Sequence, residues 1–573
     1  MDGSVTVTET IGNEQKPYLV LNGGSGNKKA RKKKAQARKP PGEKVLIESH
    51  WEELPDLIIE RIFSYLSIRD RYHASIVCRR WNDAFYLPYV WSNFVMNDMT
   101  LVRRKFNYYM GWQHVLDHMR TQNCLATIGR CIKTLVFEPM FSFHNLYEFM
   151  VMLCYYAERN KQEKAGKVIY HKGNIVPVLV EVRGGGQGIG SRISTLRFTF
   201  PCNMAATARE EDEYVFGTGG KLLESFKRLM GGLGATLKHL QLEDLLLERY
   251  EALTLLDEVC FSGCEKLRTL TLINVTKIPC QMLHAGVFVN LRVLTLSPQS
   301  LGVDLLVLLG DCPHLHHLHV VQNRYTPDNL STLPWKAWRA CRWDNPALNV
   351  HLQLENVRSG EVVWQIGAPV RSILYKSSHL KVNSSSILTA IDQYRADLQV
   401  YGHVGLPRFH RTKSYSERAD PLLLHLCRQC PNLHTLVVRE RISTATVLLL
   451  AHTGQNLRFM HVRRNAVVLR CDCPRAIDWS DTFYRWLKTA SRSYAATERE
   501  VSQILGYQWA MLSDRQFKLM TVELHESPFN VHTTRASYHT YVPPPLLPVA
   551  EKVDHTVPMQ QRRRKKEKMT KVK

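Results

Sequence analysis

A short hydrophobic motif recurs along the middle of the chain and constrains its fold more than any other feature. The motif has the form Leu-x-x-Leu-x-Leu. Copies that start at Leu267, Leu291 and Leu315 lie 24 residues apart, and the same interval separates Leu433 from Leu457. A copy of this length cannot bury a core alone, so neighbouring copies must stack, each as a short strand followed by a returning segment. The eight copies are Ile132–Phe137, Ile193–Phe198, Leu237–Leu242, Leu267–Leu272, Leu291–Leu296, Leu315–Val320, Leu433–Val438 and Leu457–Val462.

This interval and motif are typical of leucine-rich repeats. We therefore predict an α/β fold in which an irregular leucine-rich-repeat solenoid spans residues 131–470, with Leu348–Leu354 and Val370–Tyr375 as irregular strands. Residues 471–529 contain aromatic helical segments, and we expect them to cap the end of the array, which would otherwise expose its apolar core.

A second region, residues 51–94, has a helical pattern. Pro55 suits the first turn of a helix, and Ile58, Ile62 and Leu66 follow on one stripe at intervals of four. Ser67 with Asp70 fits a capping signature at the start of a second helix. The apolar residues expected on that helix are Ala74, Val77, Cys78, Trp81 and Phe85, and Trp91 anchors the end of the region.

The order and spacing of about ten of these positions resemble the F-box, with Arg71 standing where that family often has an apolar residue. The resemblance implies a helical F-box at residues 51–95 that docks on the Skp adaptor of a cullin–RING ubiquitin ligase. It implies that the F-box and its adaptor face are built by Leu54, Pro55, Ile58, Ile62, Leu66, Cys78, Trp81 and Trp91. The wider layout resembles the group of F-box only proteins 33 and 39.

A member of this family would be a non-catalytic substrate receptor of an SCF-type ligase, in which the RING subunit recruits the conjugating enzyme. The chain would then supply proximity and orientation for ubiquitination and proteasomal degradation. The alternative is a basic nuclear scaffold or nucleic-acid-binding protein whose F-box serves assembly only. The net charge of +24 is compatible with both functions, because it creates an unspecific attraction for anionic partners.

Composition bears on membrane insertion, secretion and the cellular compartment. No apolar run reaches the roughly 18 residues of a membrane span, and the N-terminus lacks the features of a secretory signal. The 14 cysteines are mostly isolated, as in reduced cytoplasmic or nuclear proteins. We expect a disordered basic tail at 1–50, a helical linker at 96–130 and a disordered Pro-rich and basic tail at 530–573. The basic clusters in the tails could be localisation signals, phosphate-binding arms or merely solvated chain.

No catalytic motif, cofactor site or metal site is expected. The glycine run Arg183–Gly190 lacks the Lys-Ser/Thr pair of a phosphate-binding loop, so a flexible insertion is favoured. Cys427 and Cys430, with Cys471 and Cys473, have a spacing that could suggest zinc, but the first pair lies where a repeat helix meets its strand and there favours core packing.

The repeat geometry predicts a substrate surface. The third and fifth motif positions, and the position after the motif, should point away from the core. This surface becomes basic and aromatic toward its C-terminal end, and we expect it to bind an acidic or phosphorylated protein segment. The candidate substrate-binding residues are His317, His319, Arg439, Phe459, His461 and Arg463.

Overall fold

The structure is a computed structural model of the 573-residue chain. It describes residues 51, 54–109, 111–140, 143–164, 188–199, 220–262, 264–328, 330–357, 361–378, 383–406, 414–522 and 524–525. The predictions for both tails and for most of the glycine run therefore lie outside the described residues. The chain divides into two compact units between Arg292 and Val293.

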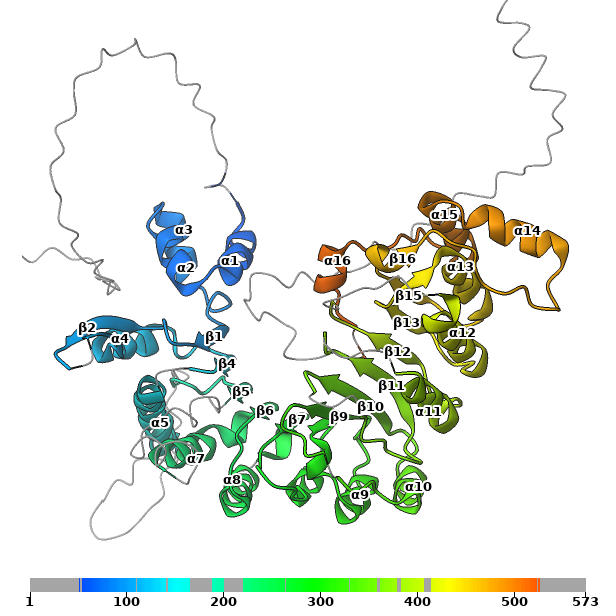
Figure 1. Cartoon of the computed structure of the whole chain (residues 1–573). Coiled ribbons are helices and arrows are strands. Elements are labelled where there is room, and N and C mark those ends of the chain that lie inside the picture. Colours follow the sequence, from blue (N-terminus) through cyan, green and yellow to red (C-terminus); the bar gives the residue numbers. More distant parts are fainter. Residues whose placement is uncertain are drawn as a thin grey trace, which may run out of the picture. The chain divides into compact units, whose positions relative to one another are not determined.

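The first unit begins with three short helices. They are α1 (Asp56–Tyr65), α2 (Ile68–Ser75) and α3 (Arg79–Phe85) (Figure 1). Pro55 is the N-cap of α1, and the Ser67 side chain accepts a hydrogen bond from the Asp70 amide, which confirms the predicted cap of α2. The prediction of a single second helix that continues through residue 85 is wrong. Cys78 has an extended backbone (φ −151°), which interrupts the helical hydrogen bonds and starts α3 in a new direction.

The strand that follows these helices belongs to the parallel sheet of the first unit. Strand β1 (Asn93–Met96) pairs with β4 (Thr134–Phe137), and the order continues through β5 (Thr195–Thr199), β6 (His239–Glu243) and β7 (Thr269–Ile273). The connections contain α5 (Phe143–Lys164), α7 (Lys221–Leu233), α8 (Arg249–Phe261) and the short helices η3 (Gly234–Thr236), η4 (Cys264–Lys266) and η5 (Leu283–Val287).

The helical linker predicted at 96–130 is wrong in its first half. An antiparallel hairpin of β2 (Val102–Asn107) and β3 (Gly111–Leu116) precedes α4 (His118–Ile128). Gly111 adopts φ +72°, a conformation that glycine tolerates and that lets the chain reverse. So short a stretch leaves the helical and the strand periods ambiguous, and the sequence therefore predicted a helix where a hairpin forms.

The second unit contains a further parallel sheet segment. Its strand order is β8-β9-β10-β11-β12-β13-β15. The strands are β8 (Val293–Leu296), β9 (His317–Asn323), β10 (Asn349–Glu355), β11 (Val370–Tyr375), β12 (Val400–His403), β13 (Thr435–Val438) and β15 (Phe459–Val462). The connections include α9 (Val303–Gly310), α10 (Trp335–Asp344), α11 (Ser384–Tyr394), α12 (Asp420–Gln429), α13 (Thr444–Thr453), η6 (Pro298–Ser300), η7 (Tyr415–Glu417) and η8 (Arg464–Ala466). A small separate pair consists of β14 (Ile442–Ser443) and β16 (Val467–Val468).

All eight motif copies form strands, and the two irregular segments form β10 and β11. The parallel register places motif leucines beside one another, as with Leu240 beside Leu270 and Leu294 beside Leu318, all of them fully buried. A largely parallel sheet with helical connections is thus confirmed. In the second unit, α9–α12 lie along one side of the sheet (Figure 1), and the opposite side is called the open face here.

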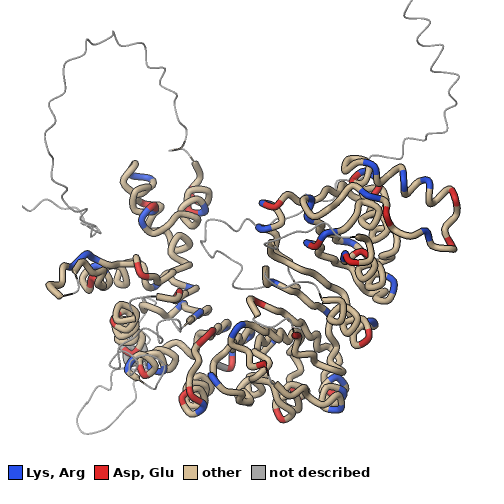
Figure 2. Tube along the Cα trace, in the orientation of Figure 1, with Lys and Arg blue, Asp and Glu red and all other residues tan. Residues whose placement is uncertain are grey.

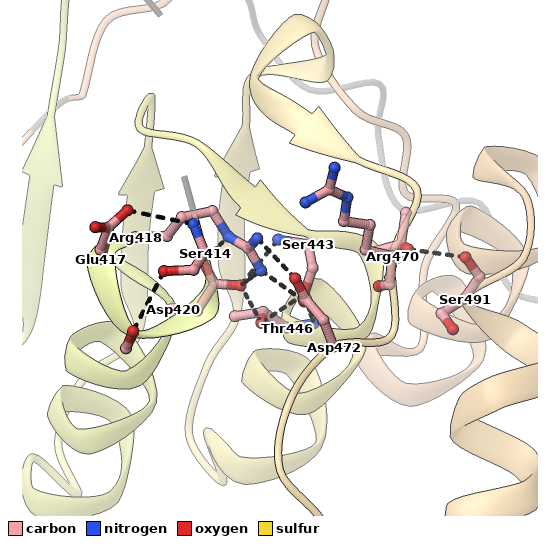
Figure 3. Close-up of polar contacts among 11 residues, drawn as sticks. Ser414, Glu417, Arg418, Asp420, Ser443, Thr446, Arg470, Asp472 and Ser491 are labelled. Atoms are coloured by element: carbon pink, nitrogen blue, oxygen red, sulfur yellow. Dashed lines mark hydrogen bonds and ion pairs between the residues drawn. The ribbon is translucent and has the colours of Figure 1, made fainter. Parts of the chain in front are cut away.

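The described residues after β16 include three helices. Two of them, α14 (Asp481–Ala490) and α15 (Tyr494–Leu505), pack against α13, and α16 (Asp514–Leu519) follows. Hydrogen bonds within a buried polar cluster connect the segments around Asp420, Ser443 and Asp472 (Figure 3). Arg418 donates to Asp420 (2.9 Å) and Asp472 (2.7 Å), and Asp420 also accepts from the Ser443 amide (2.9 Å). Burial acts against the charge of Arg418, yet the two carboxylates raise its pKa, and the hydrogen bond from Arg418 lowers the pKa of Asp472.

Among the described helices, none combines the length and apolar character needed to cross a bilayer.

Candidate functional site

The first candidate site is the outer surface of α1–α3, which we call the apolar helix face. It consists of the exposed side chains of Leu57, Ile58, Tyr65, Ile76 and Val77. Adjacent residues on α1 have opposite environments, since Ile58 is 48% exposed and Ile59 is 1% exposed. A helix this short gains little stability from its own backbone, so its buried side chains must hold it in place. The exposed apolar side chains lie outside that core, where a partner can contact them.

A compact core beneath this face fixes the three helices. Ile59, Phe63, Phe85 and Trp91 are all buried. The Trp91 indole donates to the Phe85 carbonyl at 2.6 Å, and the two rings meet edge to face with centroids 5.0 Å apart. Phe63 contacts Trp81 in the same way, at 5.7 Å. These contacts fix the helix positions before any partner binds.

Arg71, the departure from the family pattern, belongs to this core. Its Nε donates to the carbonyls of Phe63 (2.9 Å) and Leu66 (3.0 Å), and Nη2 donates to that of Ser64 (3.1 Å). Its guanidinium also lies 5.0 Å from the centre of the Trp91 ring. Burial lowers the pKa of Arg71 to about 10, so it remains charged at neutral pH. The guanidinium thus satisfies the carbonyls at the C-terminal end of α1.

The predicted adaptor residues fall into three environments. Pro55 and Ile58 are exposed, whereas Trp91 is 2% exposed and can position the helices but cannot touch a partner in this conformation. The half-buried members are Leu54, Ile62, Leu66, Cys78 and Trp81. The sequence reasoning missed Leu57, Tyr65, Ile76 and Val77 as surface candidates. Apolar side chains on more than one face of the helical pattern were the signal that could have identified them.

The second candidate site is the open face of the second unit. Four histidines meet here: His317 and His319 on β9, His351 on β10, and His525 from the C-terminal segment. His317 Nδ1 lies 3.0 Å from His351 Nε2, and His319 Nε2 lies 2.6 Å from His525 Nε2. Burial lowers the pKa of His317 to about 4 and that of His351 to about 3. His317 and His351 are therefore neutral at physiological pH.

The other predicted substrate residues are mostly engaged within the protein. Arg439 is fully buried, and its Nη1 donates to the carbonyl of Ser377 at 2.7 Å, so its side chain does not point into solvent as expected. Arg463 is 7% exposed and pairs with Asp514 at 2.6 Å. Burial lowers the pKa of His461 to about 4, while Phe459 is 43% exposed. The arginine charges at this surface thus already have partners.

The cysteine pair considered for zinc packs in the core. Cys427 lies on α12 and Cys430 ends it, and both are buried. Burial raises the pKa of each thiol to about 12. A thiol with so high a pKa stays protonated at neutral pH, and the thiolate is the form that binds metal. Both residues act here as small apolar side chains.

Comparison with known proteins identifies the first site. Residues 51–97 match the F-box-like family model. Over 44 residues, the chain is 50% identical to F-box/LRR-repeat protein 21 of Bos taurus and of Mus musculus, and 46% identical to that of Ovis aries. Each match covers 8% of this chain and 10% of the relative. The likeness is thus confined to the F-box, and it gives no support to the narrower group of F-box only proteins 33 and 39.

Residues 51–97 are therefore an F-box-like domain, and the apolar helix face belongs to it. F-box domains bind Skp adaptors within SCF complexes, so the domain implies an adaptor-binding role. Proteins with this domain are generally non-catalytic adaptors.

Proposed function

We propose that this protein is the substrate-recognition subunit of an SCF-type ubiquitin ligase, bound to the Skp adaptor and, through it, to cullin and RING subunits. The observation that carries the proposal is the apolar helix face on a pre-formed core, within a domain that matches the F-box-like model. Burying such a face is strongly favourable, because a fully buried large apolar side chain contributes about 1.5–3 kcal/mol. The complex would act in the cytoplasm, the nucleus or both.

Co-purification of the full chain with the Skp adaptor tests this function. Ile58→Asp should abolish co-purification, because it places a charge in the apolar contact without touching the core. Val287→Asp is the matched control, since Val287 is also exposed and lies in the same unit, outside the F-box-like domain. Equal adaptor recovery with both variants, each shown to be folded by circular dichroism, would refute adaptor docking through this face.

We further propose that the strand–helix units are degenerate leucine-rich repeats forming a solenoid, and that its open face captures the substrate protein. The motif spacing and the parallel register support the repeat assignment. The residues proposed to meet the substrate are His317, Phe459 and His461, and also Arg463 once Asp514 releases it. The buried His319 and Arg439 hold the surface in shape. Loss of substrate ubiquitination in Phe459→Ala, with adaptor binding intact, would support this role.

One observation favours the alternative, nucleic-acid binding. The β2–β3 hairpin exposes Phe106 and Trp112 on one face, with ring centroids 5.3 Å apart. Arg103, Arg104 and Lys105 are exposed on β2, and Figure 2 shows this run of positive residues. Aromatic rings beside cations are the usual platform for single-stranded nucleic acid.

A labelled single-stranded RNA would test this alternative with the full chain. Steep weakening of binding by salt, and at least tenfold weakening in Trp112→Ala, would establish the hairpin as a nucleic-acid contact. Binding that does not change in Trp112→Ala would exclude the hairpin.

A further inference from the structure

A segment of the chain's own C-terminal part, residues 512–522 with 524–525, lies on the open face. It begins at the edge strand β15, where the Leu512 amide donates to the Val462 carbonyl (2.8 Å) and the Arg464 amide donates to the Leu512 carbonyl (2.9 Å). It ends at His525, beside His319 on β9. These two ends contact opposite parts of the same sheet, so the segment crosses the intervening strands.

An apolar contact anchors the middle of the segment. Leu512, Phe517 and Met520 form a buried cluster with Val437 of β13, and Phe517 is completely buried. Val437 occupies the fifth position of its motif copy, one of the positions expected to face a substrate. The segment therefore fills the part of the open face where a substrate was predicted to bind.

A charged contact lies beside this cluster. Asp514, the first residue of α16, accepts from Arg463 Nε at 2.6 Å and from Arg463 Nη2 at 3.0 Å. A two-point contact of this kind fixes the orientation of a carboxylate. Arg463 was itself predicted to meet an acidic group of a substrate, and here an acidic group of the same chain takes that place.

The helix of this segment is short, and its buried apolar contact with the sheet is small. Helix α16 has six residues, and its start is capped internally by Ser513 and Gln516. Its apolar cluster has four buried residues and is separate from the row of motif leucines. Segments with few buried contacts open locally at a lower free energy than the core of a domain.

We propose that the segment of residues 512–522 is an internal competitor, and that the same surface takes a short helix of a partner protein. This helix has a carboxylate one turn before a large aromatic side chain and an apolar residue after it. In this arrangement, the partner's carboxylate replaces Asp514 on Arg463 and its aromatic ring replaces Phe517 on Val437. This inference rests on the proposed function and specifies the class of segment that the receptor recognises.

A peptide with the sequence of residues 509–523, carrying a fluorescent label, is the probe. It is titrated into the full chain and into the full-length double variant Phe517→Ala/Met520→Ala. A tethered segment reaches an effective concentration of about millimolar, so the wild-type protein should exclude the peptide. The double variant should bind it at least tenfold more tightly. Leu469→Ala, at a half-exposed site near β16, is the control and should behave as wild type.

A second peptide, with aspartate in place of the phenylalanine at position 517, should not bind either protein. Equal affinity of the first peptide for wild type and double variant would overturn the proposal, as would failure of that variant to bind. Should the double variant not fold, hydrogen exchange of the wild-type protein decides. Amides of 514–520 must then exchange at least tenfold faster than those of β13, and equal rates would overturn the proposal.

The adaptor experiment separates this inference from the proposed function. Adaptor co-purification depends on α1–α3 and should be unchanged in Phe517→Ala/Met520→Ala. Peptide exclusion without adaptor binding would leave the open face as a binding surface outside a ligase. Adaptor binding without peptide exclusion would leave the receptor function standing and remove the internal competitor.

Discussion

Large apolar side chains are exposed on the F-box-like domain, whereas on the open face of the second unit they are buried. On α1–α3, Leu57 and Val77 are more than 60% exposed, over a core that is complete without them. On the open face, Phe517 and Met520 are buried against Val437 by the chain's own C-terminal segment. One surface is left uncovered, and the other is covered from within. An uncovered apolar face fits constant assembly with an adaptor, whereas a covered one fits binding that must first displace something.

The largest effect should come from the core beneath the uncovered face. Ile59→Ala should lower the stability of α1–α3 by about 2–5 kcal/mol, because it leaves a cavity in a small core. Ile58→Ala, one residue earlier, should change stability by less than about 0.5 kcal/mol and instead weaken adaptor binding. Hydrogen exchange of the α1–α3 amides measures the first effect, and titration with the adaptor measures the second. Similar stability losses in both variants would contradict the division between core and face.

Next in size is the effect of Arg71. Arg71→Met should destabilise the same helices by about 3 kcal/mol, since the carbonyls of Phe63, Ser64 and Leu66 lose their buried partner. The neighbouring exposed Arg69 provides the control, and Arg69→Met should change little. Thermal unfolding of the two full-length variants, without the adaptor, would measure the difference in their stability. If Arg71 served only to contact the adaptor, neither variant would lose stability on its own.

A smaller effect is expected at the buried cluster of the second unit. Asp472→Asn should lower stability by about 1–2 kcal/mol at neutral pH, toward the low end for charged hydrogen bonds because Asp472 is partly exposed. The folded pKa of Asp472 lies below its unfolded value, so its contribution is complete above the unfolded value and disappears as pH falls through the folded one. The unfolding curves of the two proteins should differ at neutral pH and converge at acid pH. A constant difference at every pH would disprove the ionic origin.

The effect that is smallest at neutral pH concerns the histidines under the C-terminal segment. The folded pKa of His351 is about 3, against about 6.5 in an unfolded chain, so the unfolded state takes up the extra proton. Stability should therefore fall as pH drops from about 6.5, by up to about 1.4 kcal/mol per pH unit for one fully responsive group. His351→Gln should flatten this slope in urea unfolding between pH 7 and 5, and an unchanged slope would exclude His351. The groups facing the ring are His317, His319, His525, Ser372 and Arg371.

Sequence reasoning predicted the repeating elements well. The Leu-x-x-Leu-x-Leu copies lie on strands because each strand is buried by neighbours with the same pattern, so local and tertiary preferences agree. It failed at residues 102–116, where a turn at Gly111 makes a hairpin from a stretch that also suits a helix. It also missed β12 (Val400–His403), whose short sequence lacks the leucine motif. Such short segments take their structure from the strands beside them.

The local sequence pattern predicted less of the candidate sites than of the fold. The order of leucines, prolines and tryptophans in residues 51–97 was sufficient to indicate an F-box, because nearby positions in sequence pack together in three short helices. The covering of the open face depended on residues far apart: Arg463 and Asp514 are separated by 51 positions, and His319 and His525 by 206. Periodicity indicates on which face of its own strand a side chain lies. Only the folded chain determines whether another segment then lies over it, because that depends on packing between distant residues.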